Sequence, residues 1–151
     1  VVVSEEKLAR EPVDLCRAVE EALLSFYGAL EGRGIDPQVR LPEEPVVRQL
    51  DPSALSRVLG NILTNALKYS AGNLEVALEE SGRLTFSNSA PGLDPVAAGR
   101  LFDRFYTVEA ARNSTGLGLS IAKELTQRMG GSIGADFHNG RLTVWVEFPA
   151  G

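Results

Sequence analysis

The segment from Asp51 to Ser70 constrains the fold most, because it predicts one long core helix that also carries an unusual polar row. Asp51-Pro52 is typical of a helix start, with an N-cap side chain followed by proline at the first helical position. The residues that then recur at helical spacing form the stripe expected to be buried: Leu55, Val58, Leu59, Ile62, Leu63, Ala66 and Leu67. Any fold of this chain has to cover that stripe.

The polar row lies on a second face of the same helix. Arg57, Asn61, Asn65 and Lys68 follow one another at i, i+4, i+8 and i+11. Two carboxamide oxygens can meet one cation while an ammonium meets an anion, so the row suits a phosphate and its metal ion. The alternative is a solvated face, which is the usual role of Asn and Lys on an amphipathic helix. Because Asn is a poor helix former, two of them one turn apart favour the binding role.

A second motif, from Ser114 to Gly131, predicts another helix with glycines at its start. The helix begins near Leu117, and Gly130 is expected to end it as a left-handed C-cap. The glycines allow close approach of a ligand to free backbone N–H groups, where the helix dipole favours an anion such as phosphate. Alone the motif is weak, since Gly116-x-Gly118 lacks the third glycine of a dinucleotide fingerprint and no strand pattern immediately precedes it.

Together these motifs resemble those of a known family. Asn61-x-x-x-Asn65-Ala66-x-Lys68-Tyr69-Ser70, then Leu101 to Tyr106, then Thr115 to Lys123 resemble the N box, F box and G2 box of sensor histidine kinases, in that order. The resemblance covers about Asp14 to Pro149. It implies the catalytic and ATP-binding domain of a two-component kinase. The implied fold is α/β, a two-layer sandwich of a mixed, mostly antiparallel sheet with helices packed on one face (the Bergerat, or GHKL, fold).

The remaining patterns agree with that fold. Apolar spacing predicts a helix from Val13 to Leu30, and a short strand is expected at Val39-Arg-Leu41. Alternating residues on both sides of Ser81-Gly82 predict one hairpin, and those around Asn139-Gly140 predict a second. Two hairpins beside three long helices suit a two-layer sandwich.

Composition limits the possible classes of protein. A chain of 151 residues with 44% hydrophobic content supports a single domain, residues 1–151. The net charge of −5 argues against nucleic acid as a partner. No apolar run is long enough to span a membrane, and a signal peptide is not expected at the start of the chain. The single Cys16 excludes an internal disulfide and is expected to be a small core residue, while His138 is expected to be a histidine beside a turn without a special role.

The resemblance also implies roles for individual residues. Asn65 is the expected Mg²⁺ ligand, Asn61 assists on the phosphate and metal side, and Lys68 contacts the terminal phosphates of ATP. Tyr69 is expected beside the adenine or ribose, with a helix-end core position as the alternative. The backbone amides at the start of the second helix are expected to bind phosphate: Thr115, Gly116, Leu117, Gly118 and Leu119.

The resemblance to the F box implies a short ATP lid from Thr107 to Thr115 that is anchored by phenylalanines of the box. Phe102 and Phe105 are the expected anchors, although both could equally be ordinary core residues. Arg104 and Arg112 match basic positions that reach the phosphates when the lid closes.

The adenine-side box departs from the family pattern. Most members have Asp-x-Gly-x-Gly, whereas this chain has Asn88-Ser89-Ala90-Pro91-Gly92, followed by Leu93 and Asp94. The aspartate normally accepts a hydrogen bond from the adenine amino group. Asn88 can accept through its carbonyl oxygen, but a neutral acceptor makes a weaker bond. Ala90 replaces the first glycine and Gly92 is retained, while Asp94-Pro95 is typical of a cap for a short helix from Val96 to Phe102.

The chain has no His-Glu/Asp-rich box, so the phosphoacceptor histidine is expected on a separate dimerisation domain, with a response regulator further downstream. Residues 1–12 are expected to be the remnant of the connection to that domain. The fragment is expected to be soluble, monomeric and cytoplasmic, in a full-length protein anchored in the cell membrane. Its expected reaction is transfer of the γ-phosphoryl group of Mg-ATP to the histidine.

Two other classes remain open. One is an ATPase of the same superfamily, in which a glutamate base stands at the position of Asn61; an asparagine cannot deprotonate water. The other is a nucleotide-binding interaction module with weakened catalysis, suggested by the altered Asn88 to Ala90 box. A serine kinase of the anti-sigma type also belongs to the superfamily, but the Phe102 to Tyr106 element favours the histidine kinase.

Overall fold

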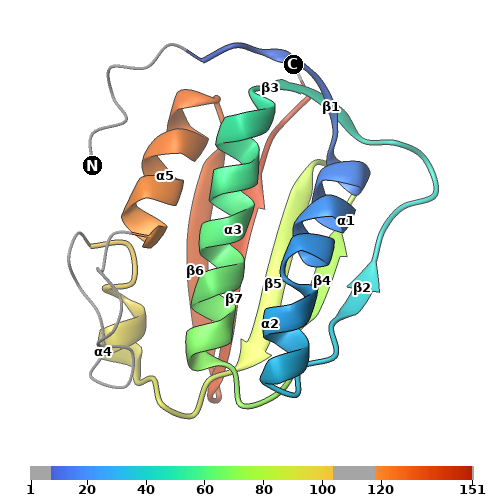
Figure 1. Cartoon of the computed structure of the whole chain (residues 1–151). Helices are drawn as coiled ribbons and strands as arrows, with labels where there is room; N and C mark the ends of the chain where they lie inside the picture. The colour runs from blue at the N-terminus through green and yellow to red at the C-terminus, as the bar shows by residue number, and fades with distance from the viewer. Residues whose placement is uncertain (1–7, 104–117, 151) are drawn as a thin grey trace.

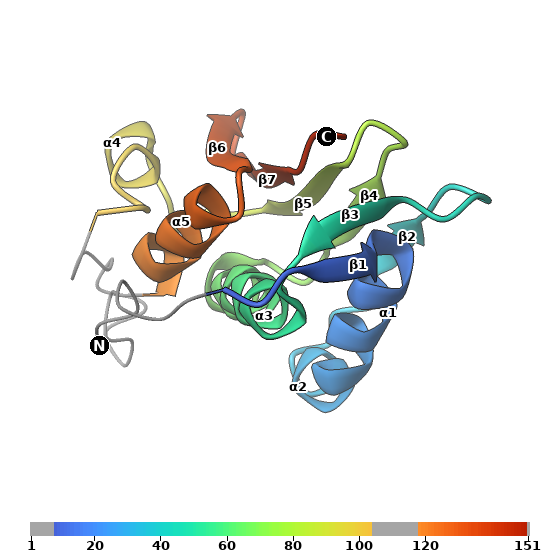
Figure 2. The ribbon, with the colours of Figure 1, turned by 90° about the horizontal axis from the view of Figure 1, so that it is seen from above.

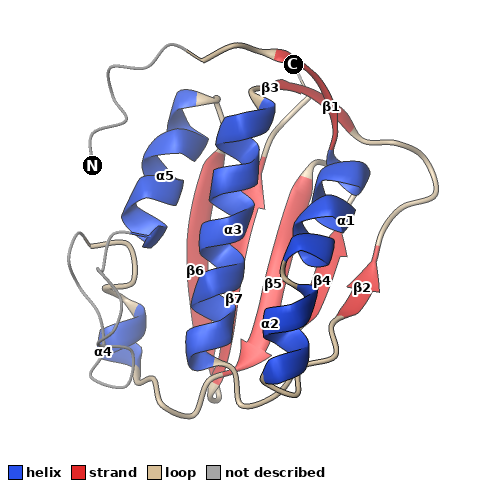
Figure 3. Cartoon of the chain, viewed as in Figure 1, coloured by secondary structure: helices blue, strands red, loops and turns tan. Residues whose placement is uncertain are grey.

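The computed structural model describes residues 8–103 and 118–150, and its centre is a five-stranded mixed sheet (Figure 1, Figure 3). The strands lie in the order β2-β4-β5-β7-β6. Their bounds are Gln38–Arg40 (β2), Glu75–Leu78 (β4), Arg83–Ser89 (β5), Arg141–Glu147 (β7) and Ser132–His138 (β6). Only β2 and β4 pair in parallel within this sheet, and the other neighbours are antiparallel. The expected mixed, mostly antiparallel sheet is confirmed.

The helices form the second layer. They comprise α1 (Leu15–Ser25), α2 (Tyr27–Gly32), α3 (Pro52–Tyr69) and α5 (Gly118–Arg128), and Figure 2 shows all four on the same side of the sheet. A short helix, α4 (Pro95–Ala98), lies near the β6 edge. The two-layer α/β sandwich predicted from the sequence is therefore confirmed. No helix in residues 8–103 and 118–150 has both the length and the apolar character needed to cross a bilayer.

Both predicted hairpins are present. The β6–β7 turn places Asn139 and Gly140 at φ of 52° and 76°, the left-handed conformation that this pair of residues tolerates well. In β5 the buried residues Leu84, Phe86 and Asn88 alternate with partly exposed ones, and β7 alternates in the same way. The buried face meets the helices. Asn88 is thus a polar residue at the end of an otherwise apolar row under the helical layer.

The core is continuous between the two layers. The predicted stripe of α3 is buried at Leu55, Val58, Leu59, Ile62 and Leu63, each at most 1% exposed. The sheet contributes the buried side chains listed here: Val76, Leu78, Leu84, Phe86, Leu142, Val144 and Val146. Because α3 packs centrally against the sheet, its polar row is held in a fixed orientation relative to both β5 and α5 (Figure 1).

The first third of the chain differs from the prediction. The helix expected from Val13 to Leu30 begins only at Leu15, because Asp14 caps it by accepting from the Cys16 N–H at 3.0 Å. It breaks at Phe26, whose ring carbon lies 3.7 Å from where a Cβ of Gly60 would be.

A small second sheet is present that the sequence patterns did not predict. Strands β1 (Glu11–Asp14) and β3 (Val47–Leu50) pair antiparallel across more than thirty residues of chain. The helix expected from Val96 to Phe102 is also shorter, since α4 ends at Ala98. The Asp94 cap is confirmed by its bond from the Ala97 N–H at 2.7 Å.

Candidate nucleotide-binding site

The polar row of α3 faces the first residue of α5. Asn61 Nδ2 donates to the Gly118 carbonyl at 2.8 Å, although the two residues are 57 positions apart in the sequence. A Cβ at Gly118 would lie 4.0 Å from Cβ of Asn61, so the backbone at this helix start lies close to the row. The two motifs that the sequence suggested independently are therefore brought together. With Nδ2 occupied by Gly118, the carbonyl oxygen of Asn61 is the end that can accept from a ligand or bind a cation.

Both ends of α3 are fixed by side chains. At the N-terminus, the Asp51 carboxylate accepts from the N–H groups of Ser53 at 2.9 Å, Ala54 at 3.1 Å and Ala9 at 2.8 Å. These bonds, the one from Ala9 foremost, lower the pKa of Asp51. At the C-terminus, the Arg33 guanidinium donates to the carbonyls of Leu67 and Ser70. The polar row between these ends is consequently pre-organised.

Asn65 and Lys68 lie in partly apolar surroundings. Asn65 is only 6% exposed, and Lys68 is half-buried. Burial lowers the pKa of Lys68, because loss of hydration disfavours its charged form. An anion placed beside this ammonium would favour its charged form and so oppose the lowering of its pKa, which suits a phosphate-binding lysine. Tyr69 is also half-buried and packs against the core, which is compatible with the role of a core aromatic at the helix end.

Asn88 is buried at 2% exposure, and its Nδ2 donates to the Ser89 carbonyl at 3.1 Å. Ala90 is fully buried, and its N–H donates to the Gly140 carbonyl at 2.7 Å. The backbone here is thus held by the β6–β7 turn without the family's first glycine. Gly92 is exposed, with nothing within 4 Å of the position of a Cβ.

The side chains of two expected binding residues lie in the hydrophobic core. Leu93 is 7% exposed and Leu119 is 6% exposed, and both belong to the hydrophobic core. They can offer a ligand only their backbone groups. Phe102 is partly buried against the core, as a lid anchor or a core residue would be. The remaining expected residues lie outside the described residues: Arg104, Phe105, Arg112, Thr115, Gly116 and Leu117.

The donor set restricts which metal the site could hold. Residues 8–103 and 118–150 contain no group of three or more His, Cys, Asp or Glu side chains placed to bind a metal ion. The oxygen donors in the polar row of α3 are the carboxamides of Asn61 and Asn65. One or two neutral oxygens suit Mg²⁺, which keeps several waters and binds phosphate oxygens. The residues therefore fit a magnesium ion that arrives together with a nucleotide.

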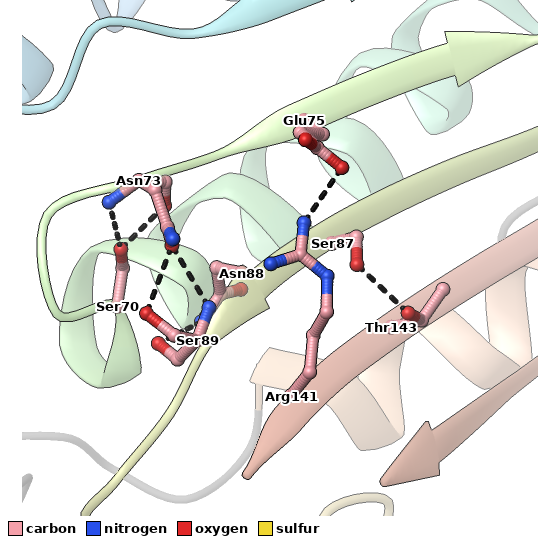
Figure 4. Close-up of polar contacts among 8 residues, drawn as sticks. All are labelled: Ser70, Asn73, Glu75, Ser87, Asn88, Ser89, Arg141 and Thr143. Atoms are coloured by element: carbon pink, nitrogen blue, oxygen red, sulfur yellow. Dashed lines mark hydrogen bonds and ion pairs between the residues drawn. The ribbon is translucent and has the colours of Figure 1, made fainter. Parts of the chain in front are cut away.

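One polar residue of this region was missed by the sequence reasoning. Asn73, in the turn after α3, accepts through Oδ1 from both the N–H and the hydroxyl of Ser89 (Figure 4). The only sequence feature that could have pointed to it is the turn-forming run Ser70-Ala-Gly-Asn73. Its contact with Ser89 joins segments that are 16 residues apart.

A helix row of Asn61, Asn65 and Lys68, facing the start of a second helix above a mixed sheet, defines an ATP-binding domain of the Bergerat type. Residues 50–151 match the family described as histidine kinase-, DNA gyrase B- and HSP90-like ATPase, and the chain belongs to this family.

The curated relatives identify the branch of the family. The chain is 34% identical over 129 residues to the sensor histidine kinase YcbM of Bacillus subtilis, covering 80% of this chain and 40% of that protein. It is 34% identical over 150 residues to the signal transduction histidine-protein kinase BaeS of Escherichia coli, covering 93% and 32%. The chain thus spans a third to two fifths of the length of these relatives and corresponds to the catalytic, ATP-binding domain of a sensor histidine kinase.

Solved structures agree with this assignment. The mycobacterial sensor histidine kinase MprB superposes with a TM-score of 0.79 at 25% identity, covering 93% of this chain and 97% of that one. Full-length ShkA, solved in complex with AMPPNP, gives a TM-score of 0.76 at 27% identity and covers 95% of this chain and 32% of that one.

Proposed function

We propose that this domain binds Mg-ATP between α3 and the start of α5 and transfers the γ-phosphoryl group to a histidine on a separate dimerisation domain. A response regulator then receives the phosphoryl group, and the chain is the cytoplasmic part of a membrane-anchored kinase joined through residues 1–12 to the dimerisation domain. The observation that carries the proposal is the 2.8 Å bond from Asn61 to Gly118, which unites the polar row with the helix start. The nucleotide analogue bound by full-length ShkA supports the same assignment.

The residues of this chain bind and orient the nucleotide. Asn65 is the ligand we assign to Mg²⁺, assisted by Asn61, and Lys68 is assigned to the terminal phosphates. When bound, the metal ion would neutralise part of the phosphate charge. On the adenine side, Asn88 is assigned as the acceptor for the 6-amino group, with Tyr69, Gly92 and Leu93 bordering the base. Arg104, Arg112 and the backbone of 115–119 are assigned to the phosphates as well.

Phosphoryl transfer fits this set of residues because it requires positioning and charge neutralisation rather than a protein nucleophile from this domain. The bond between the γ-phosphorus and the bridging oxygen of ADP breaks, and a bond forms from phosphorus to the histidine nitrogen of the other domain. Asn61 stands where the related ATPases have a glutamate base, and a carboxamide cannot take a proton from water. Slow hydrolysis of ATP by the chain alone is therefore expected.

The test combines binding and transfer. Isothermal titration of ADP and ATP with and without Mg²⁺ is expected to show metal-dependent affinity that Asn65→Ala abolishes. Thr64→Ala is the matched control: Thr64 is the preceding residue of α3, is exposed, and donates to the Gly60 carbonyl at 2.8 Å. It is expected to leave affinity unchanged.

Radiolabel from γ-phosphate is expected on an added dimerisation domain and only negligibly on the chain itself. Rapid steady-state phosphate release without transfer would favour the ATPase class instead. Nucleotide binding with neither transfer nor hydrolysis would favour the interaction module.

A further inference from the structure

The turn between α3 and β4 is bonded to the end of β5, next to Asn88 (Figure 4). Asn73 Oδ1 accepts from the Ser89 N–H at 2.8 Å and from the Ser89 hydroxyl at 3.1 Å. The backbone adds a second link, because the Ala71 N–H donates to the Ser89 carbonyl at 3.0 Å. Ser89 is therefore held on both its N–H and its carbonyl by the same short turn.

The turn is itself fixed to α3. Ser70 is 5% exposed, and its hydroxyl oxygen accepts from the N–H groups of Gly72 and Asn73, both at 3.0 Å. The same hydroxyl donates to the Asn73 carbonyl, so it meets the turn on three sides. Ser70 also continues α3, since its N–H donates to the Ala66 carbonyl at 2.9 Å. The position of Ser89 is thus set by the helix that carries Asn61, Asn65 and Lys68.

The held carbonyl of Ser89 determines which way the Asn88 carboxamide points. A carbonyl oxygen can only accept, so the end of the carboxamide that lies 3.1 Å from it must be Nδ2 and not Oδ1. Oδ1 is then the end that can meet a ligand. This matters here because Asn, unlike the Asp of most relatives, could present either a donor or an acceptor to the base. Adenine carries a 6-amino donor where guanine carries a 6-oxo acceptor.

We propose that Asn73 is a positioning residue that makes the site selective for adenine by fixing Ser89 and, through it, the orientation of the Asn88 carboxamide. Asn73 is exposed and acts through Ser89 rather than by touching the nucleotide. The inference rests on the proposed function, in which Asn88 is the adenine acceptor. It assigns to the turn after α3 a role in base selection that the phosphate-binding row does not have.

The experiment measures the ratio of dissociation constants for GDP and ADP on the full 151-residue chain. Asn73→Ala removes the acceptor for both Ser89 donors and is expected to lower the preference for ADP about tenfold, the effect of one hydrogen bond of about 1.4 kcal/mol. Asn73→Asp keeps an acceptor oxygen in the same place and is expected to restore the preference. Ser87→Ala is the matched control, because its hydroxyl lies on the same strand and hydrogen-bonds with Thr143 at 2.9 Å, on the face of β5 opposite to Asn88.

The same substitution in an Asn88→Asp chain distinguishes a positioning role of Asn73 from a general effect on stability. In Asn88→Asp the carboxylate has no donor end, so Asn73→Ala is expected to leave the ADP preference of that variant unchanged. An equal loss of ADP and GDP affinity in Asn73→Ala, or an unchanged ratio, overturns the inference while the proposed function stands. Failure of the unsubstituted chain to bind ADP at all would instead count against the proposed function.

Discussion

The substitution Asn88→Asp restores the residue that most relatives have, yet the structure predicts that it makes the nucleotide-free domain less stable. The Asn88 side chain is 2% exposed, and its Nδ2 donates to the Ser89 carbonyl at 3.1 Å. A carboxylate at this place loses that donor and puts a negative oxygen against a carbonyl oxygen. It also has to be removed from water, because the site lies at the buried end of β5.

The magnitude follows from these two terms. Loss of one neutral hydrogen bond costs about 1 kcal/mol. Desolvation of the carboxylate adds several kcal/mol in principle, reduced by local relaxation and water entry. We expect the free energy of unfolding to fall by about 2–4 kcal/mol at about pH 8. In the complex, a charged acceptor is about twice as strong as a neutral one, so ADP is expected to bind about fivefold tighter, or about 1 kcal/mol.

The loss of stability should depend on pH in a defined direction. Burial raises the pKa of the introduced carboxyl above its unfolded value of about 3.9. A raised carboxyl pKa means that the folded state holds the proton over the range between the two pKa values. Stability relative to the unsubstituted chain is therefore retained below about pH 4 and falls as the pH rises toward the folded pKa.

The assay is urea unfolding of both chains at about pH 4 and about pH 8, with and without ADP, beside calorimetric titration of ADP. Asn88→Ala is the control, since it removes donor and acceptor without adding charge, and it should weaken ADP binding. The reasoning is refuted if Asn88→Asp is as stable as the unsubstituted chain at about pH 8. A large loss of ADP affinity in Asn88→Asp would show that Asn88 does not occupy the family's aspartate position.

Three further predictions concern the two helices of the site. Gly118→Ala should bind ATP at least about tenfold more weakly. Its free energy of unfolding should stay unchanged to within about 0.5 kcal/mol, because the nearest described atom would lie 4.0 Å from the added Cβ. A matching loss of stability in urea would mean that Gly118 has a packing role. In titrations across alkaline pH, the affinity for ATP should fall as the pH rises through the lowered pKa of Lys68. Lys68→Arg should show no such fall, because arginine stays charged. Identical pH profiles for the two chains would mean that Lys68 does not contact the phosphates. Asp51→Ala should lower the free energy of unfolding by about 1–2 kcal/mol at neutral pH through loss of the α3 cap. Because the pKa of Asp51 is lowered, this difference should disappear as the pH falls below about 4, and a difference that persists in acid would contradict the cap.

Much of the fold could be predicted because its patterns are local. The helix Pro52–Tyr69 follows from the Asp51 cap and the 3.6-residue spacing of apolar side chains, and both hairpins follow from turn residues at Gly82 and Gly140. The family motifs lie within these elements, so most candidate residues could be named before their positions were known. The missed β1–β3 pairing joins two four-residue strands distant in the chain, and no short-range pattern reports such a pairing.

The sequence by itself determined which chemical groups the site has: two carboxamides and an ammonium on one helix, and an asparagine where relatives have an aspartate. Only the tertiary structure decided how they are oriented. The carboxamide of Asn61 faces Gly118 because α3 and α5 pack together, and that of Asn88 is turned by a serine that Asn73 holds. A carboxamide has a donor end and an acceptor end of nearly equal shape, so its binding role depends on neighbours that lie far away in the sequence.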